Sequence, residues 1–226
     1  EGNTNVGYSI SNFTMSLRDE NGFVNKWYDQ SGNSNDATAE ADADEPQIVS
    51  DGSLETGATG KPTINFDAAS SNFLSASVAT TQPFTTTIQF NGAKSTVVNS
   101  TLQNLIDSQS TSQNSFTQIQ GEGELVINHG SVFDSGRDVD SFGESVIISV
   151  ANGSSSSIDF NGATQVTGDA GTKNRDAIRI GRHRTNSGNF FNGNMSELLI
   201  HNSQLSNSTI DTLESNIISH YNITEI

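Results

Sequence analysis

The feature that most constrains the fold is a series of short apolar or alternating stretches, each four to seven residues long. Most of them are followed at once by residues that favour turns. Strands of this length, separated by polar turns, are typical of an all-β antiparallel sandwich with two sheets. The predicted strands cover residues 23–28, 63–66, 84–90, 102–106, 115–119, 124–128, 145–151, 157–160, 177–180 and 195–201.

Asn-Gly pairs strengthen this prediction, because Asn and Gly adopt the positive φ angles that tight hairpins need. Two polar segments, residues 39–45 and 108–113, are expected to be solvated loops. The pairs are Asn91-Gly92, Asn152-Gly153, Asn161-Gly162 and Asn192-Gly193.

One segment near the C-terminus has the period of an amphipathic helix. Its apolar positions are Ile210, Leu213, Ile217 and Tyr221. Ser206 or Ser208 is expected to cap its start, and Asp211 and Glu214 are expected near the positive end of the helix dipole. The sequence therefore predicts one short helix packed against the sandwich.

Length and charge limit the class of protein. A chain of 226 residues is expected to form one domain over residues 1–226. The net charge of −16 excludes nucleic acid as a partner, because nucleic-acid binding needs clustered Lys and Arg. No apolar run is long enough for membrane insertion, and the absence of Cys excludes a disulfide scaffold. The charge indicates either solubility or an acidic binding face.

The segment VNKWYDQSGNSNDA, residues 24–37, contains the only Trp and a dense set of turn-forming residues. Asp29, Asn33, Asn35 and Asp36 offer the oxygen ligands that calcium prefers, and the Gly between them allows a sharp bend. Calcium is therefore the one cofactor that the residues suggest. The alternative is an Asx turn, in which Asp and Asn side chains accept bonds from backbone N–H groups nearby.

Two aromatic residues precede this turn. The ring of Trp27 offers a surface for stacking on a sugar, or it packs in the core. Because successive strand residues point to opposite faces, either Trp27 or Tyr28 is expected to be exposed. Tyr28 is the candidate ligand-binding residue of the pair.

Five of the ten basic residues lie within twelve positions: Lys173, Arg175, Arg179, Arg182 and Arg184. This cluster predicts a local positive patch for an acidic or sulfated glycan, or it neutralises acidic loops around it. The candidate ligand-binding residues here are Arg182, His183, Arg184 and, in the following Asn/Gly-rich loop, Asn189.

Three blocks in order resemble one family. They are KWYDQSGNSNDA (residues 26–37), GKPTINFD (residues 60–67), and IRIG (residues 178–181) followed by FFNGNMSELLIH (residues 190–201) and the terminal helix. This pattern resembles the concanavalin A-like lectin/glucanase superfamily, in particular the laminin G-like modules of bacterial surface and phage proteins. The resemblance implies a jelly-roll sandwich and a role in carbohydrate binding, adhesion or surface structure.

The first block is also similar to a run in the catalytic domain of arabinofuranosidase B. That family's Glu nucleophile lies in a Cys-containing segment, which has no counterpart here, so no catalytic residue is carried over. We therefore expect a non-enzymatic carbohydrate-binding or adhesion module on a virion or cell surface, outside the cell, with a glycan or polysaccharide as its partner. The alternatives are a structural decoration or fibre protein of a virion, which contacts other virion or surface subunits, and a glycoside hydrolase.

Overall fold

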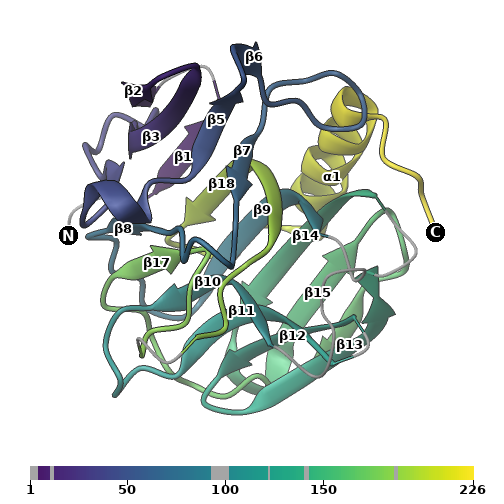
Figure 1. Cartoon of the computed structure of the whole chain (residues 1–226). Coiled ribbons are helices and arrows are strands. Elements are labelled where there is room, and N and C mark those ends of the chain that lie inside the picture. Colours follow the sequence, from purple (N-terminus) through teal and green to yellow (C-terminus); the bar gives the residue numbers. More distant parts are fainter. Residues whose placement is uncertain (1–4, 11–12, 93–101, 122, 140–142, 186–187) are drawn as a thin grey trace.

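The computed structural model describes residues 5–10, 13–92, 102–121, 123–139, 143–185 and 188–226, and these form an antiparallel β-sandwich with one helix (Figure 1). The fold class predicted from the sequence is confirmed. The strands are β1 (Val6–Ser9), β2 (Phe13–Arg18), β3 (Asn21–Trp27), β4 (Ala37–Thr38), β5 (Gln47–Ser50), β6 (Ser53–Leu54), β7 (Ile64–Phe66), β8 (Leu74–Ala76), β9 (Phe84–Gly92), β10 (Gln103–Ser108), β11 (Ser115–Gln120), β12 (Glu124–His129), β13 (Val132–Asp138), β14 (Glu144–Ala151), β15 (Ser156–Phe160), β16 (Val166–Gly168), β17 (Ile178–Ile180) and β18 (Gly193–His201).

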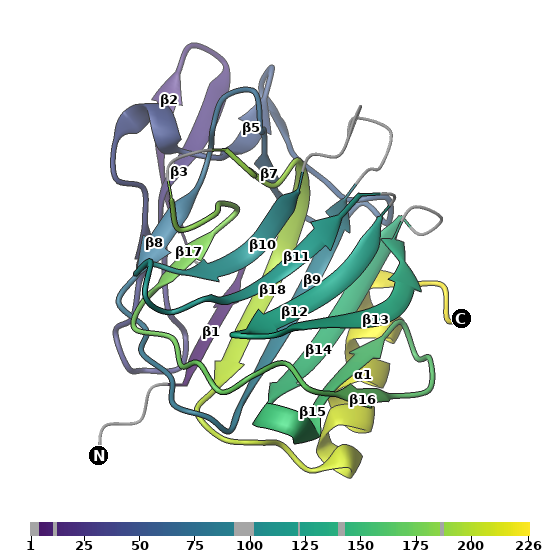
Figure 2. The ribbon, with the colours of Figure 1, turned by 90° about the horizontal axis from the view of Figure 1, so that it is seen from below.

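The strands form two layers that face each other (Figure 2). One layer has the order β1-β18-β9-β14-β15-β16, and the other has the order β8-β17-β10-β11-β12-β13. Strands β4, β3, β5 and β7 connect the layers through hydrogen-bonded pairs, so the sandwich is one sheet curled back on itself.

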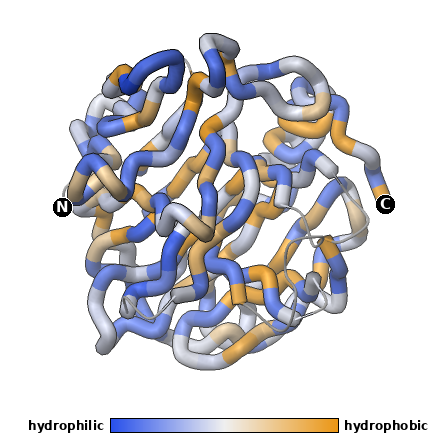
Figure 3. Tube along the Cα trace, in the orientation of Figure 1, coloured by the Kyte–Doolittle hydropathy of each residue, from blue (hydrophilic) through white to orange (hydrophobic). Residues whose placement is uncertain are grey.

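The main core lies between the two layers, where apolar side chains alternate with polar ones along the strands (Figure 3). Trp27 is among the largest fully buried side chains, and its Nε1 donates to the carbonyl of Ser9 at 2.8 Å. Burial of a Trp with its N–H satisfied adds apolar area without leaving an unpaired donor. Trp27 is therefore a core residue, and its ring is not available to stack on a sugar.

The helix α1 (Asn207–Tyr221) covers the outer side of β14. Ile210, Ile217 and Tyr221 pack there against Val146, Ile148 and Val150, as the apolar period predicts. The Ser206 side chain caps the helix by accepting from the backbone N–H of Thr209.

Two acidic residues of α1 are not where the sequence places them. No acidic residue lies in the first turn of the helix, so the prediction that Asp211 and Glu214 complement the helix dipole there is wrong. The helix begins at Asn207, which puts both residues in later turns, and Glu214 is buried.

All ten predicted strands are present, with ends shifted by up to two residues. Eight further strands are short or mostly polar, and the apolar pattern does not detect them: β1, β2, β4, β5, β6, β8, β13 and β16. Asn161-Gly162 forms the expected turn with positive φ at both residues, but Asn91-Gly92 lies inside β9. The acidic segment 39–45 is not wholly solvated, because Glu45 is buried and pairs with Arg18 at 2.5 Å.

Candidate functional site

The turn proposed to bind calcium is held together by its own hydrogen bonds. The carboxylate of Asp29 accepts from the backbone N–H groups of Ser31 at 2.8 Å, Asn35 at 3.1 Å and Gly7 at 3.3 Å. Burial acts to raise the pKa of Asp29, but these hydrogen bonds outweigh it and hold the pKa below its ordinary value. This is the arrangement of an Asx turn, which also ties the turn to β1.

The remaining predicted calcium ligands also make hydrogen bonds within the turn or to β1 and its flank. Asp36 accepts from the Asp29 backbone N–H at 3.1 Å, and its other oxygen lies 3.5 Å from Lys26 Nζ. The amide nitrogen of Asn33 donates to the carbonyl of Asn5, and the carbonyl of Asn35 accepts from the Tyr8 hydroxyl. The carboxylates of Asp29 and Asp36 already accept N–H donors that an ion would displace, so they fit a hydrogen-bonded turn better than a calcium site. Within the described residues, no group of three or more His, Cys, Asp or Glu is placed to hold a metal ion.

Tyr28 lies just beyond the end of β3 and is half-buried, whereas Trp27 is in the core. Trp27 is thus the buried member of the pair, but Tyr28 is half-buried and not exposed as predicted. Lys26 Nζ lies 5.4 Å from the centre of the Tyr28 ring, close enough for a cation–π contact.

The basic cluster does not form an exposed positive patch. Arg175 is 2% exposed, donates to Thr86 Oγ1 at 2.8 Å and lies over the Phe84 ring. Arg182 is 7% exposed and stacks over Phe73 at 4.3 Å. The sequence clusters these residues, but strand β17 and the loop after it turn the guanidinium groups toward aromatic rings and carboxylates. The prediction of a positive binding patch is wrong for these arginines.

Two of the predicted ligand-binding residues, His183 and Arg184, lie around the buried carboxylate of Asp107, and a third, Asn189, bonds to the strand that carries Asp107. The backbone N–H and the guanidinium of Arg184 donate to Asp107 Oδ2 at 2.9 and 3.2 Å, and His183 Nε2 is 3.7 Å from the same oxygen. The carbonyl of Asn189 accepts from the backbone N–H of Asn104, on the same strand. These bonds fix Arg184 and Asn189 against β10, and both residues are half-buried.

The Asp107 network is electrostatically unusual. Burial raises the pKa of Asp107 to about 6, although the bond from Arg184 and the charges of Arg184 and Arg175 act to lower it. Burial lowers the pKa of His183, and the charge of Arg184 lowers it further. Both shifts favour the neutral form of these two side chains, and the bonds between Asp107 and Arg184 connect the segment after β17 to β10.

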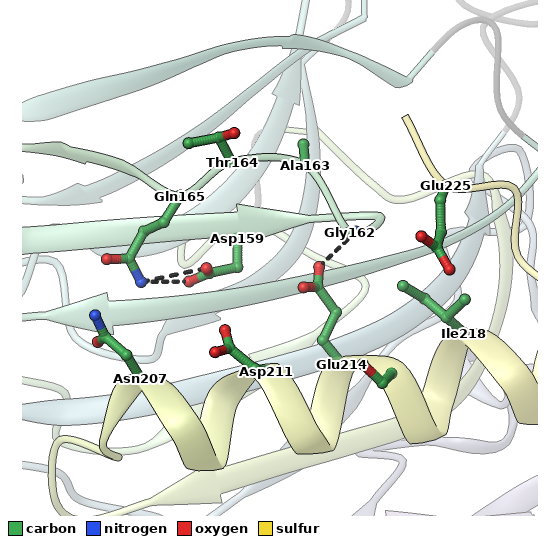
Figure 4. A pocket seen from close by; sticks show the side chains of 11 residues that line it. Asp159, Gly162, Ala163, Thr164, Gln165, Asn207, Asp211, Glu214, Ile218 and Glu225 are labelled. Atoms are coloured by element: carbon green, nitrogen blue, oxygen red, sulfur yellow. Dashed lines mark hydrogen bonds between the residues drawn. The ribbon is translucent and has the colours of Figure 1, made fainter.

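A pocket of about 370 Å³ between α1 and the β15–β16 hairpin is acidic (Figure 4). Asp159, Asp211, Glu214 and Glu225 line it, and no Lys or Arg is among its described lining residues. Glu214 accepts from the backbone N–H of Gly162 at 2.9 Å. Burial raises the pKa of Asp159 and of Glu214, and the neighbouring carboxylates raise both further. The pocket affects stability, and nothing in it indicates a ligand.

A row of carboxamide side chains crosses four adjacent strands on the outer side of the sandwich. Gln47 on β5 is paired with Asn65 on β7, Asn65 with Asn194 on β18, and Asn194 with Asn91 on β9. Residues directly opposite each other in antiparallel strands point to the same face. We call these four residues the carboxamide row; their strands lie side by side in Figure 1.

The carboxamide row forms the floor of an open cleft of about 430 Å³, which Asp67, Asn192 and Gly193 complete. All seven lining residues are half-buried. Gln47 is held by bonds to Asn21 and Val49. Within the described residues, the side chains of Asn65, Asn91 and Asn194 have no hydrogen-bond partner, so their donors and acceptors face the cleft.

The sequence gives little sign of this row. Asn91 and Asn194 adjoin glycines, so the pattern indicates turns. Only the strand register brings the four residues together, and the pair most distant in sequence, Asn65 and Asn194, is 129 positions apart. The one available signal is Asn at positions that alternate with core residues, as in Ile64-Asn65-Phe66.

No protein-family model and no curated protein sequence matches the chain. The fold is similar to several solved structures. An arabinofuranosidase complexed with arabinofuranosyl-alpha-1,2-xylobiose is 14% identical, with a TM-score of 0.63 over 89% of this chain and 52% of that chain. The binding domain of Paraclostridial Mosquitocidal Protein 1 is 14% identical, with a TM-score of 0.62 over 90% of this chain and 51% of that chain.

Botulinum neurotoxin type C, whose cell entry depends on interaction with two ganglioside molecules, is 13% identical, with a TM-score of 0.62 over 93% of this chain and 51% of that chain. The chain thus spans about half the length of the structures it matches. At these identities the similarity establishes a β-sandwich fold and does not establish function. The laminin G-like assignment stays a prediction. Among the described residues, the single α-helix is too short and too polar to cross a membrane.

Proposed function

We propose that the protein is a carbohydrate-binding module that holds its glycan in the cleft over the carboxamide row and does not hydrolyse it. The observation that carries this proposal is the row itself, with three amide side chains that face the cleft without a protein partner. Each amide offers two N–H donors and a carbonyl acceptor. A sugar hydroxyl both donates and accepts, so a row of amides complements a polyhydroxylated chain.

Binding without hydrolysis is supported by the acids that line the cleft. A glycosidase needs two carboxyl groups about 5 Å apart, or roughly 6.5 to 9.5 Å apart, on either side of the scissile bond. Asp67 is the single carboxylate among the described residues that line this cleft. Its oxygens already accept from the Ala69 backbone N–H and the Ser70 hydroxyl. Display outside the cell, on a virion or cell surface, is part of the same proposal.

The similar structures agree with a glycan partner without identifying it. One of them holds an arabinofuranosyl-xylobiose, and another belongs to a toxin that interacts with gangliosides. The partner of this chain follows instead from the carboxamide row, which lacks the basic residues that an acidic glycan needs.

The test is affinity electrophoresis through gels that contain arabinoxylan, mixed-linkage glucan, galactomannan or laminarin, repeated with an Asn65→Ala, Asn194→Ala double variant. We expect retardation by at least one polysaccharide and a loss of affinity of at least tenfold in the double variant. Asn216→Ala is the matched control, because Asn216 is exposed on α1, away from the cleft. Release of reducing ends by the protein would contradict the non-enzymatic part of the proposal.

A further inference from the structure

The cleft does not end at β5. A second pocket of about 190 Å³ shares Gln47, Asn65 and Asp67 with it as lining residues. Beyond these shared residues, the second pocket is lined by Arg18 and Phe23 of the β2–β3 hairpin and by residues of the segment 42–45. The two cavities therefore adjoin along one side of β5 and β7.

We infer that the two cavities form one groove for an uncharged glycan chain, which lies across β9, β18, β7 and β5 and places one end in the smaller pocket. This inference rests on the proposed function and adds the class of glycan, its direction and its end. Neighbouring strands lie about 4.8 Å apart, so the row from Asn91 to Gln47 spans about 14 Å. A chain of several sugars is needed to contact all four amides at once.

The smaller pocket is built as the end of such a groove. The guanidinium of Arg18 is fixed by the buried carboxylate of Glu45 at 2.5 Å and lies 4.7 Å from the centre of the Phe23 ring. Phe23 is half-buried and lines the pocket with Arg18 over the face of its ring. The fixed Arg18–Phe23 pair therefore closes the groove at this end, and a terminal sugar placed here would lie against the pair.

The charges of the groove select against acidic glycans. Asp42, Glu45 and Asp67 line it, and Arg18 is the single cation among its described lining residues. Arg18 is already neutralised by Glu45. An acidic or sulfated chain would therefore meet uncompensated carboxylates on a protein of net charge −16. An uncharged chain is not repelled by these carboxylates, and it leaves no charged group of its own without a partner.

The experiment is isothermal titration with disaccharide to hexasaccharide fragments of the polysaccharide that retards the protein most, and with a sulfated preparation of the same polysaccharide. We expect affinity to rise at least tenfold with chain length before it levels off, and sulfation to lower it at least tenfold. Ala43 is exposed and lines the smaller pocket, so Ala43→Trp obstructs that pocket without removing a hydrogen-bond partner. This variant is expected to bind the hexasaccharide no better than the wild-type protein binds a shorter fragment.

The outcomes separate this inference from the proposed function. Three results would each overturn the groove: equal affinity for all chain lengths, tighter binding of the sulfated chain, or unchanged binding by Ala43→Trp. A loss of affinity in the Asn65→Ala, Asn194→Ala variant would still support glycan binding in that case. No binding of any polysaccharide by the wild-type protein would overturn both. Unchanged melting temperatures, measured for every variant, show that a loss of affinity is not a loss of folding.

Discussion

Replacement of Asp107 by Asn gives a quantitative test of the electrostatics behind the loop that follows β17. The side chain of Asp107 is completely buried, and its pKa is raised from 3.8 to about 6. At about 1.4 kcal/mol per pH unit, this difference corresponds to about 3 kcal/mol of stability. Because the pKa of the folded state is raised, this stability is present below pH 4 and is lost as the pH rises through about 6.

Asn has the same size as Asp and stays uncharged at every pH. The free energy of unfolding of Asp107→Asn, minus that of the wild-type protein, should therefore rise by about 3 kcal/mol between about pH 3 and about pH 7. For a chain of this length that corresponds to a relative gain of about 6 to 12 °C in Tm. Urea and thermal denaturation of both proteins at half-unit pH steps measure it, and the midpoint of the change should lie at about pH 5, halfway between the unfolded pKa of 3.8 and the folded pKa of about 6.

Other buried acids also titrate, but they affect both proteins and cancel in the difference. Asp51→Asn, in an exposed turn where the φ of 47° suits Asn, serves as the control and should follow the wild-type curve. A difference between Asp107→Asn and the wild-type protein that stays constant within about 0.5 kcal/mol would refute the reasoning. A relative loss of stability at neutral pH would show that the contacts of Asp107 with Arg184 and His183 outweigh its burial.

Three further changes test other parts of the structure. Glu214→Gln keeps the hydrogen bond from the Gly162 N–H and removes a buried carboxyl group whose pKa is raised. The Tm of this variant should therefore exceed the wild-type Tm at pH 7, and the two values should converge in acid. A variant Tm below the wild-type value at pH 7 would contradict this. Trp27→Ala should cost about 3 to 5 kcal/mol in urea denaturation, and a cost below about 1 kcal/mol would mean that the ring is not a core residue. Millimolar calcium or a chelator should leave Tm unchanged, because hydrogen bonds alone close the turn at Asp29. A calcium-dependent rise in Tm that Asp29→Asn abolishes would restore the ion site.

The strands with clear apolar patterns were predictable from the sequence, because burial against the opposite layer requires alternating apolar residues. β14 and β18 are examples, and both lie where the pattern places them. β2 was not predictable in the same way, since its side chains are mostly exposed or half-buried and its polar residues carry no period. β4 and β6 have two residues each, too few for any pattern.

The candidate site was less predictable for a related reason. A cluster along the chain, such as Arg182 to Arg184, says nothing about the direction in which the side chains point, and packing turned these inward. The residues of the carboxamide row, by contrast, are far apart in the sequence and are brought together only by the strand register. Register depends on long-range pairing, which local propensity does not specify.

The most direct test of the account is the binding of an uncharged polysaccharide by the wild-type protein and by Asn65→Ala, Asn194→Ala, with Asn216→Ala beside them. The account predicts saturable binding by the wild-type protein and by Asn216→Ala, and at least tenfold weaker binding by the double variant at an unchanged Tm. Equal binding by all three proteins would contradict the assignment of the glycan to the carboxamide row.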